Sequence, residues 1–293
     1  MGSTNDALLL KVPRSPTALM QHLQLLVGRG HKFWCGGTIA PAKLAAFVQN
    51  KMAIRYPISR SVNGRSFDRR KGLAAVHFIA FPLADGNVAW WLLSDDGPGG
   101  LNDPAAPDAH VTRDAMSAGG HITFADYVLH YAHKKDLRTI TDKRSGKKKK
   151  VLTDISTWTW ALTDRVFNEV RAHIERTAAR LDYGDEGIAG AAPKGLRGIL
   201  LYQRSRPLFS GVRGQVLALH RIADDHWSRV RTLWLSRHPR YVARYGDKAG
   251  ALRPINEVIH KHLPKMGRVL VYGDEPMRLR DLAASQAPPA ASA

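Results

Sequence analysis

Two apolar segments joined by a tight-turn signal constrain the fold of this chain most. Residues 73–81 (LAAVHFIAF) and 88–93 (VAWWLL) are rich in β-branched and aromatic side chains. The connection between them contains Asp85-Gly86, and Asp-Gly between two such segments is a specific signal for a β-hairpin. The sequence therefore predicts an antiparallel pair of strands, around which the rest of the N-terminal region must fold.

Helical patterns surround a further strand in the N-terminal region. Residues 15–26 have apolar side chains at helical spacing and begin with Ser15-Pro16, an N-cap followed by proline at the first helical position. Residues 31–39 are a candidate strand, in which Gly36-Gly37 indicates a bulge or a close approach of another backbone. Residues 41–55 begin with a proline and end before another, which predicts a second helix.

The sequence changes character in its last third, where long helical patterns replace strand-like segments. Residues 212–235 form a six-turn amphipathic pattern, whose apolar positions recur at intervals of three and four. These positions are Val212, Val216, Leu219, Ala223, Trp227, Val230 and Trp234. Further helices are expected at residues 165–181, 240–245 and 254–263 and after Pro276, with a short strand at residues 268–272.

These patterns predict an α+β fold, with an antiparallel sheet and packed helices followed by a mainly helical C-terminal subdomain. We expect an α+β domain at residues 7–181 and a basic helical subdomain at residues 196–284. The glycine-rich residues 182–195 (DYGDEGIAGAAPKG) are interpreted as a linker. Residues 285–293 are small and rich in Pro and Ala, and are expected to form a disordered tail.

The most concentrated charge lies at residues 134–150, between the strand candidates 127–133 and 151–162. This segment has nine Lys and Arg and two Asp, and the whole chain has 44 basic against 25 acidic residues, a net charge of +19. Such a cluster repels itself unless it is solvated, mobile or neutralised by a polyanion. A Lys-rich β-hairpin that contacts the phosphate backbone of DNA or RNA is the leading hypothesis. A solvated charge run without a partner is the alternative.

Two other basic regions extend the candidate interface. Residues 55–71 contain several arginines and are interpreted as a loop, and Arg forms bidentate contacts with phosphate or guanine. The long helix carries basic residues off its apolar positions, although Asp224-Asp225 also fits an ordinary solvated face. The candidate nucleic-acid-binding residues are Arg60, Arg65, Arg69, Arg70 and Lys71 of the loop, Lys143, Arg144, Lys147, Lys148, Lys149 and Lys150 of the hairpin, and Arg213 and Arg221 of the long helix.

Two alternative functions remain open at this stage. Asp95 and Asp96 follow a strand and could hold Mg²⁺ in a nuclease or nucleotidyl transferase, although Asp and Gly here also fit a plain turn. The lysines could instead dock an acidic protein partner. The thirteen histidines form no recognised catalytic or metal motif, so the catalytic residues are unknown, and neither a metal site nor a cofactor is predicted.

Tryptophans and cysteine limit the remaining possibilities. Trp158 and Trp160 lie on one face of their strand, which predicts packing in a core rather than stacking on bases. A single cysteine, Cys35, excludes an intramolecular disulfide and any zinc site of several thiolates, so a reducing cytoplasmic setting is expected. No segment approaches the roughly 18 to 20 apolar residues of a membrane span, so a membrane partner is not expected. The sequence does not indicate an oligomeric state.

Overall fold

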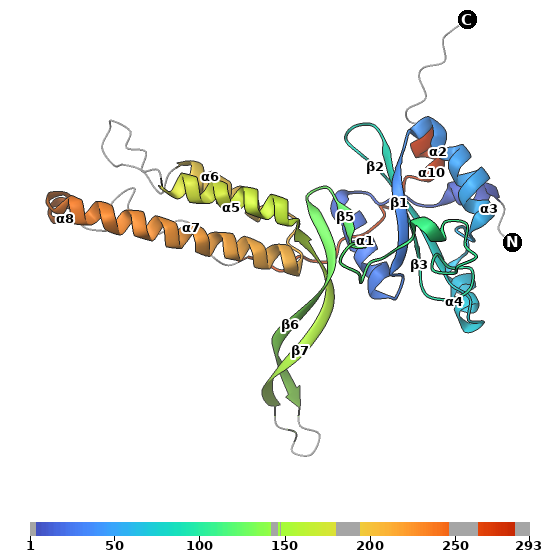
Figure 1. Ribbon diagram of the computed structural model, residues 1–293, viewed down its shortest axis with the longest axis horizontal. Helices are drawn as coiled ribbons and strands as arrows, with labels where there is room; N and C mark the ends of the chain where they lie inside the picture. Colours follow the sequence, from blue (N-terminus) through green and yellow to red (C-terminus); the bar gives the residue numbers. More distant parts are fainter. Residues whose placement is uncertain (1–3, 142–145, 147, 180–193, 246–262, 285–293) are drawn as a thin grey trace, which may run out of the picture. The chain divides into compact units, whose positions relative to one another are not determined.

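The computed structural model describes residues 4–141, 146, 148–179, 194–245 and 263–284 (Figure 1). Antiparallel sheets and packed helices make this an α+β protein, as the sequence predicts. Contacts divide the chain into two units. Unit 1 comprises Met1–Ile122, Leu129–Trp158 and Arg268–Ala293, and unit 2 comprises Thr123–Val128 and Thr159–Gly267.

A four-stranded sheet forms the centre of unit 1, in the order β2-β3-β1-β4. Its strands are β1 (Phe33–Ile39), β2 (Val76–Pro82), β3 (Val88–Ser94) and β4 (Arg113–Asp114). The antiparallel pairing of β2 with β3 confirms the predicted hairpin, and β1 pairs with the other edge of β3. A Cβ atom on Gly36 would lie 2.6 Å from the carbonyl oxygen of Trp90, so glycine at this position permits the close backbone approach that the sequence indicates.

One face of this sheet is covered by helices from both ends of the chain. The elements that pack here are η1 (Thr4–Leu9), α2 (Pro41–Phe47), the π-helical η2 (Val48–Met52), α3 (Ala53–Arg55) and α10 (Leu279–Ala284). Leu44, Val48 and Met52 meet Phe78, Leu92, Leu279 and Leu282 in one buried core. The predicted helix at residues 41–55 is therefore present, with a π-helical turn at its centre.

The other face of the sheet is also largely apolar, with Ile79, Phe81, Trp91 and Leu93 buried on it, but it carries a histidine as well. In β2, Val76, Phe78 and Ala80 belong to the core just described, so the alternation of a strand places His77 on the opposite face. Helix α1 (Pro16–Gly28) begins as predicted, because the Ser15 hydroxyl accepts a hydrogen bond of 3.2 Å from the amide of Ala18. His22 of this helix lies within electrostatic range of His77.

The C-terminal segment returns to the N-terminal residues of unit 1. The amides of Val12 and Arg14 donate to the carbonyls of Met277 and Val271, at 2.8 and 3.0 Å. The predicted strand at residues 268–272 is wrong, because these backbone contacts are isolated and build no ladder. Among the described residues of this segment, the bridge that forms joins Lys11 to Arg278. Helix α10 confirms the expected terminal helix.

A second sheet has three strands in the order β5-β6-β7. These are β5 (Ile122–Phe124), β6 (Tyr127–Thr141) and β7 (Lys148–Leu162). The two long strands confirm the Lys-rich hairpin, but the predicted ends of its arms at residues 133 and 151 are wrong. Strand pairing satisfies backbone groups whatever the side-chain charge, so β6 and β7 continue into the basic segment. Trp158 and Trp160 are buried, as predicted.

Unit 2 is a packed group of helices. Its helices are α5 (Asp164–Ala179), α6 (Lys194–Arg204), α7 (Ser210–Arg237) and α8 (Pro239–Tyr245). Ile174 of α5 and Leu200 of α6 pack with Leu219, Ala223 and Trp227 of α7, which confirms the apolar pattern of the long helix. The contact division differs from the boundaries expected from sequence, because α5 joins the helical unit and residues 268–284 join unit 1.

Several sequence-based expectations concern segments that the structure does not describe. Most of the proposed linker, the tail at residues 285–293 and the expected helix at residues 254–263 lie outside the described residues, Lys194, Gly195 and Leu263 excepted. Within the described part of the chain, no helix combines the length and the apolar character needed to cross a bilayer.

Candidate nucleic-acid interface and a buried histidine cluster

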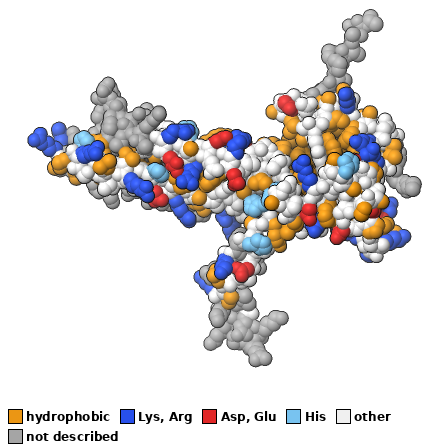
Figure 2. Space-filling model, viewed as in Figure 1, with side chains coloured by type: hydrophobic (Ala, Val, Ile, Leu, Met, Phe, Trp, Pro, Cys, Tyr) orange, Lys and Arg blue, Asp and Glu red, His pale blue; other side chains and the backbone are white. Residues whose placement is uncertain are grey.

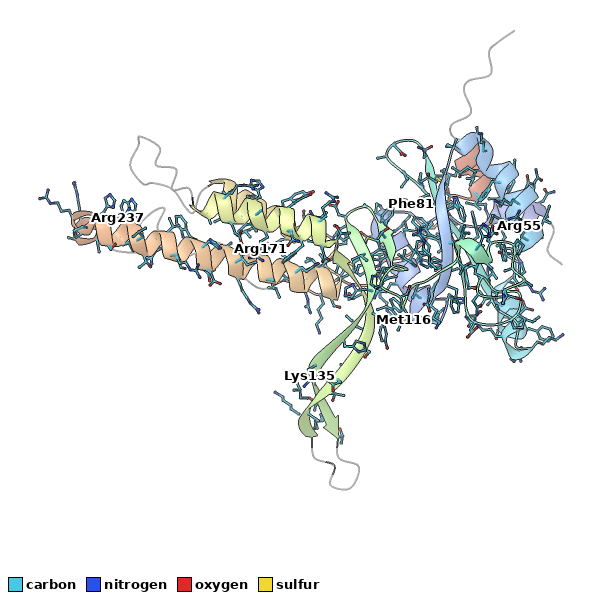
Figure 3. All side chains as sticks on the ribbon, viewed as in Figure 1. Arg55, Phe81, Met116, Lys135, Arg171 and Arg237 are labelled. Atoms are coloured by element: carbon cyan, nitrogen blue, oxygen red, sulfur yellow. The ribbon has the colours of Figure 1, made fainter. Side chains whose placement is uncertain are left out.

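The outer part of β6 and β7 carries exposed lysines on both strands. Lys135 of β6, labelled in Figure 3, is exposed, and so are Lys148 and Lys150 of β7. Lys149 also lies in β7, whereas Lys143, Arg144 and Lys147 lie outside the described residues. We call residues 133–141 and 148–156 the lysine ribbon.

Contacts near the base of the ribbon indicate which side chains share a face. Tyr131 lies beside Trp158, with 5.3 Å between ring centroids, and His133 Nδ1 lies 2.7 Å from Ser156 Oγ. Both pairs fit one antiparallel register, in which odd-numbered residues of β6 share a face with even-numbered residues of β7. This face therefore also holds Lys135, Lys148, Lys150 and the 60% exposed Leu152, together with Asp154.

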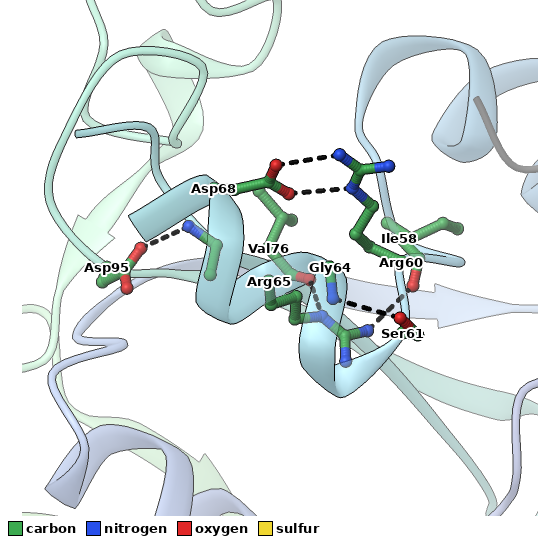
Figure 4. Close-up of polar contacts among 9 residues, drawn as sticks. Ile58, Arg60, Ser61, Gly64, Arg65, Asp68, Val76 and Asp95 are labelled. Carbon is green, nitrogen blue, oxygen red and sulfur yellow. Dashed lines mark hydrogen bonds and ion pairs between the residues drawn. The ribbon is translucent and has the colours of Figure 1, made fainter. Parts of the chain in front are cut away.

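The second basic region is a helix, and its prediction as a loop is wrong. Helix α4 spans Val62–Arg70, and the hydroxyl of Ser61 accepts a hydrogen bond of 3.1 Å from the amide of Gly64 (Figure 4). Asn, Gly and Ser within the helix have weak helix propensity, which explains why the sequence pattern missed it. The N-cap and two C-terminal arginines at the negative end of the helix dipole support it.

Three of the candidate arginines of this region are held by acceptors of the protein itself. Arg60 forms a bidentate pair with Asp68, with two contacts of 2.9 Å, and Arg65 donates to the carbonyls of Val76 and Ile58, each at 3.1 Å (Figure 4). Arg69 donates to Asp95. In contrast, Arg70 and Lys71 are exposed, with their charges 6.0 and 4.4 Å from the ring centre of Phe67. Those two side chains are the members of this group that a phosphate backbone reaches most easily.

The pair of carboxylates proposed as metal ligands is engaged in internal contacts. Asp95 Oδ2 accepts from Arg69 Nε at 2.6 Å, and Asp95 Oδ1 accepts from the amide of Ala75 at 2.5 Å. Asp96 accepts a hydrogen bond from the side chain of Asn102. No group of three or more His, Cys, Asp or Glu among the described residues is arranged to hold a metal ion. The geometry thus favours the turn interpretation of these residues.

The basic residues of α7 are spread along the helix rather than gathered. Arg221 is exposed and Arg213 is half-buried. Figure 2 shows Lys and Arg side chains distributed along the helical unit and interrupted by acidic ones. The structure therefore supports an exposed position for Arg221 without bringing it into a basic cluster with Arg213.

A cluster of histidines that the sequence patterns do not reveal lies on the side of the central sheet opposite the core of α2 and α10. His31, just before β1, has its ring 4.4 Å from that of His77 in an edge-to-face arrangement. Arg69 Nη2 lies 2.5 Å from His31 Nε2. Because a guanidinium only donates, Nε2 must accept, and the neutral ring therefore carries its proton on Nδ1. His22 of α1 contacts the ring of Tyr272, with centroids 5.9 Å apart.

Burial keeps these histidines neutral. Burial lowers the pKa of His22 to about 4, and the charges of Arg65 and Arg29 lower it in the same direction. The pKa of His31 is also lowered to about 4, mainly by burial, although the Asp95 carboxylate acts to raise it. Burial and then the charge of Arg65 lower the pKa of His77 to about 2. Strongly shifted groups of this kind gather at functional sites more often than elsewhere.

The members of this cluster come from positions far apart in the chain, between His22 and Tyr272. Sequence reasoning missed them because no two of the three histidines follow a recognised spacing. One signal was present, since His77 interrupts the apolar pattern of residues 73–81 at a position that a buried strand normally fills with an apolar side chain.

Comparisons with known proteins give no family for this chain. It matches no protein-family model, no curated protein and no solved structure. Its function must therefore be inferred from its own residues.

Proposed function

We propose that this protein binds nucleic acid and that the lysine ribbon contacts the phosphate backbone. The observation that carries the proposal is the gathering of Lys135, Lys148 and Lys150, all exposed, on one face of a two-stranded ribbon. Asp154 is the described acidic residue on this face. Lysine ammoniums suit phosphate contact without base recognition, because each is a flexible point charge.

The dimensions of the ribbon fit a nucleic-acid groove. The major groove of B-DNA is about 12 Å wide and admits a two-stranded β-ribbon. Residues two apart on one strand are separated by about 6.8 Å, so Lys148 and Lys150 would span about two phosphate steps along the helix axis. This spacing supports contacts with every second phosphate of one strand.

The energetics of the ribbon favour a polyanionic partner. A two-stranded hairpin with no covering layer is marginally stable in water, and like charges on it add repulsion. The exposed Leu152 on the lysine face shows that this part of the ribbon has little apolar cover. Neutralising the lysines would remove the repulsion and release the counterions condensed on the nucleic acid, which is the main source of non-specific affinity.

Fluorescence polarisation with labelled oligonucleotides tests the proposal. The full-length protein is titrated against duplex DNA, single-stranded DNA and RNA over a series of salt concentrations. Combined Lys135→Gln, Lys148→Gln and Lys150→Gln changes should weaken binding to each probe and reduce the salt slope on duplex DNA by about 3, because each lost phosphate contact removes about 0.9.

A charge-matched control separates this role from a general effect of net charge. Arg14, Lys43 and Arg280 are exposed in unit 1 and distant from the ribbon in sequence, and their combined change to Gln removes the same charge. This control should leave affinity and slope near those of the unchanged protein. Equal effects of the two triple variants would contradict the proposed role of the ribbon. If an acidic protein copurifies and stays bound after nuclease treatment, while no nucleic acid copurifies, the docking alternative would be favoured instead.

A further inference from the structure

The histidine cluster contains a half-buried positive charge that forms no ion pair with a described carboxylate. Arg65 is partly removed from water and donates to two backbone carbonyls, which are neutral acceptors. It forms no ion pair with any described carboxylate, in contrast to Arg60 and Arg69 of the same region. Since a guanidinium does not lose its proton in proteins, this charge must persist inside unit 1. An isolated buried charge is costly unless a counterion compensates it.

The charges around Arg65 do not compensate it. Asp68 acts electrostatically on Arg65 but is paired with Arg60, and Asp95 is paired with Arg69. Burial holds the phenol of Tyr272 in its neutral form by raising its pKa. His22, His31 and His77 are neutral for the reasons given above. The three guanidiniums of Arg60, Arg65 and Arg69 and the two carboxylates of Asp68 and Asp95 therefore leave one positive charge in excess at this place.

The polar atoms in the cluster are able to receive an oxyanion. The buried Nδ1 of His31, which carries the ring proton, has no acceptor in good hydrogen-bonding geometry, although the backbone carbonyl of Ala75 interacts with this ring. The side chain of Arg69 is 43% exposed, and His22, His77 and Tyr272 are only half-buried, so the cluster is accessible from the surface of unit 1. Guanidinium, imidazole and phenol donors are the groups that commonly bind phosphate and sulfate.

We propose that Arg65, Arg69 and the histidines at positions 22, 31 and 77 form a binding site for a tetrahedral oxyanion of the phosphate class. A dianion would bring the local charge from +1 to −1. Protonation of one histidine would restore neutrality, so binding is coupled to proton uptake. The ligand is either a free phosphate or the terminal phosphate of a nucleic-acid strand, which share this chemistry.

Sulfate and inorganic phosphate are the probes that test the site, with sulfate preferred because it stays dianionic over the whole range used. Titration calorimetry on the full-length protein at pH 6, in two buffers of different ionisation enthalpy, should show saturable binding with uptake of about one proton. Affinity for sulfate should rise by up to about tenfold per pH unit as the pH falls from 7 towards 5, because the protonated histidine is stabilised by the bound anion.

Arg65→Met is the decisive variant, because it removes the uncompensated charge while keeping a side chain of similar length. It should weaken sulfate binding at least about tenfold, as expected for the loss of charge-assisted hydrogen bonds, whereas Lys43→Gln should not. If Arg65→Met fails to fold, the imidazole resonances of the unchanged protein provide a second measurement. The pKa values of His31 and His77 should rise when sulfate is added, and should not rise with chloride at equal ionic strength.

The outcomes separate the two ligand sources and the two proposals. If a 5′-phosphorylated strand binds more tightly than the same strand with a 5′-hydroxyl, the ligand of the site is the end of a nucleic-acid strand. If the two strands bind equally and sulfate still binds, the ligand is a free anion. Calorimetric and resonance changes identical in sulfate and chloride would overturn the oxyanion site. The triple lysine variant of the ribbon should keep sulfate binding, so failure of one proposal is distinguishable from failure of the other.

Discussion

Acidification should destabilise unit 1 before its carboxylates titrate. His22 has a pKa of about 4 in the folded protein and 6.5 as its ordinary value. Between these values the unfolded chain binds the proton and the folded chain does not, so stability is fully present above about pH 6.5 and declines as the pH falls towards 4. At pH 5 the loss from this one group is about 2 kcal/mol. His31 has the same shift and adds a further loss in the same window.

Urea unfolding at pH 7 and pH 5 measures this effect. The solutions should contain chloride and no sulfate or phosphate, because these oxyanions would bind the proposed site. The His22→Gln variant removes one titrating group, so its stability relative to the unchanged protein should improve by about 2 kcal/mol between pH 7 and pH 5. His110→Gln, at an exposed histidine of η3 (Ala109–Val111), is the matched control and should give no such change. An equal loss of stability in all three proteins between the two pH values would refute the assignment of acid sensitivity to the buried cluster.

Three further predictions follow from packing and burial. Gly36→Ala should cost about 1 to 3 kcal/mol in urea unfolding, because the new methyl would press on the Trp90 carbonyl; an unchanged midpoint would contradict the close approach. Trp227→Ala should lower the free energy of unfolding by about 3 to 5 kcal/mol. It should also lower hydrogen-exchange protection in α5 and α7 but not in β1–β3, and an equal loss of protection in all of these elements would argue against separate units. Burial raises the pKa of Cys35 to about 12, so a thiol reagent at pH 8 should label it only as urea unfolds unit 1; rapid labelling of the native protein would disagree.

The parts of the fold that were predictable are those set by local chemistry. The Ser15 cap, the Asp85-Gly86 hairpin and the apolar positions of the long helix each depend on residues close together in sequence, and the structure confirms all three. Helix α4 was missed because its stability comes from Arg65 and Arg69 reaching other elements, which overrides the weak helix propensity of its own residues.

The histidine cluster could not be predicted, because its members meet only through tertiary structure. His31 precedes β1, His77 lies within β2 and His22 lies on α1, and none of the intervals between them has the regular spacing of a helix or strand motif. The charge density of residues 55–71 also could not predict which arginines are available to a partner. The number of arginines does not show which of them are held by acceptors within the protein. Those assignments require the positions of Asp68, Asp95 and the backbone carbonyls.

The return of the C-terminal segment to unit 1 fixes the order in which the two cores are completed during synthesis. Leu279 and Leu282 belong to a core whose other buried members all lie before residue 102, whereas the buried core of unit 2 lies between Ile174 and Trp227. The ribosome therefore delivers every residue of the helical core before the last two leucines of the sheet core. On a nascent chain, α5 to α7 are able to pack before α10 has been synthesised and has covered the central sheet. A premature stop codon after Gly267 but before Leu279 would thus keep every residue of the helical unit and leave the sheet with an open apolar face.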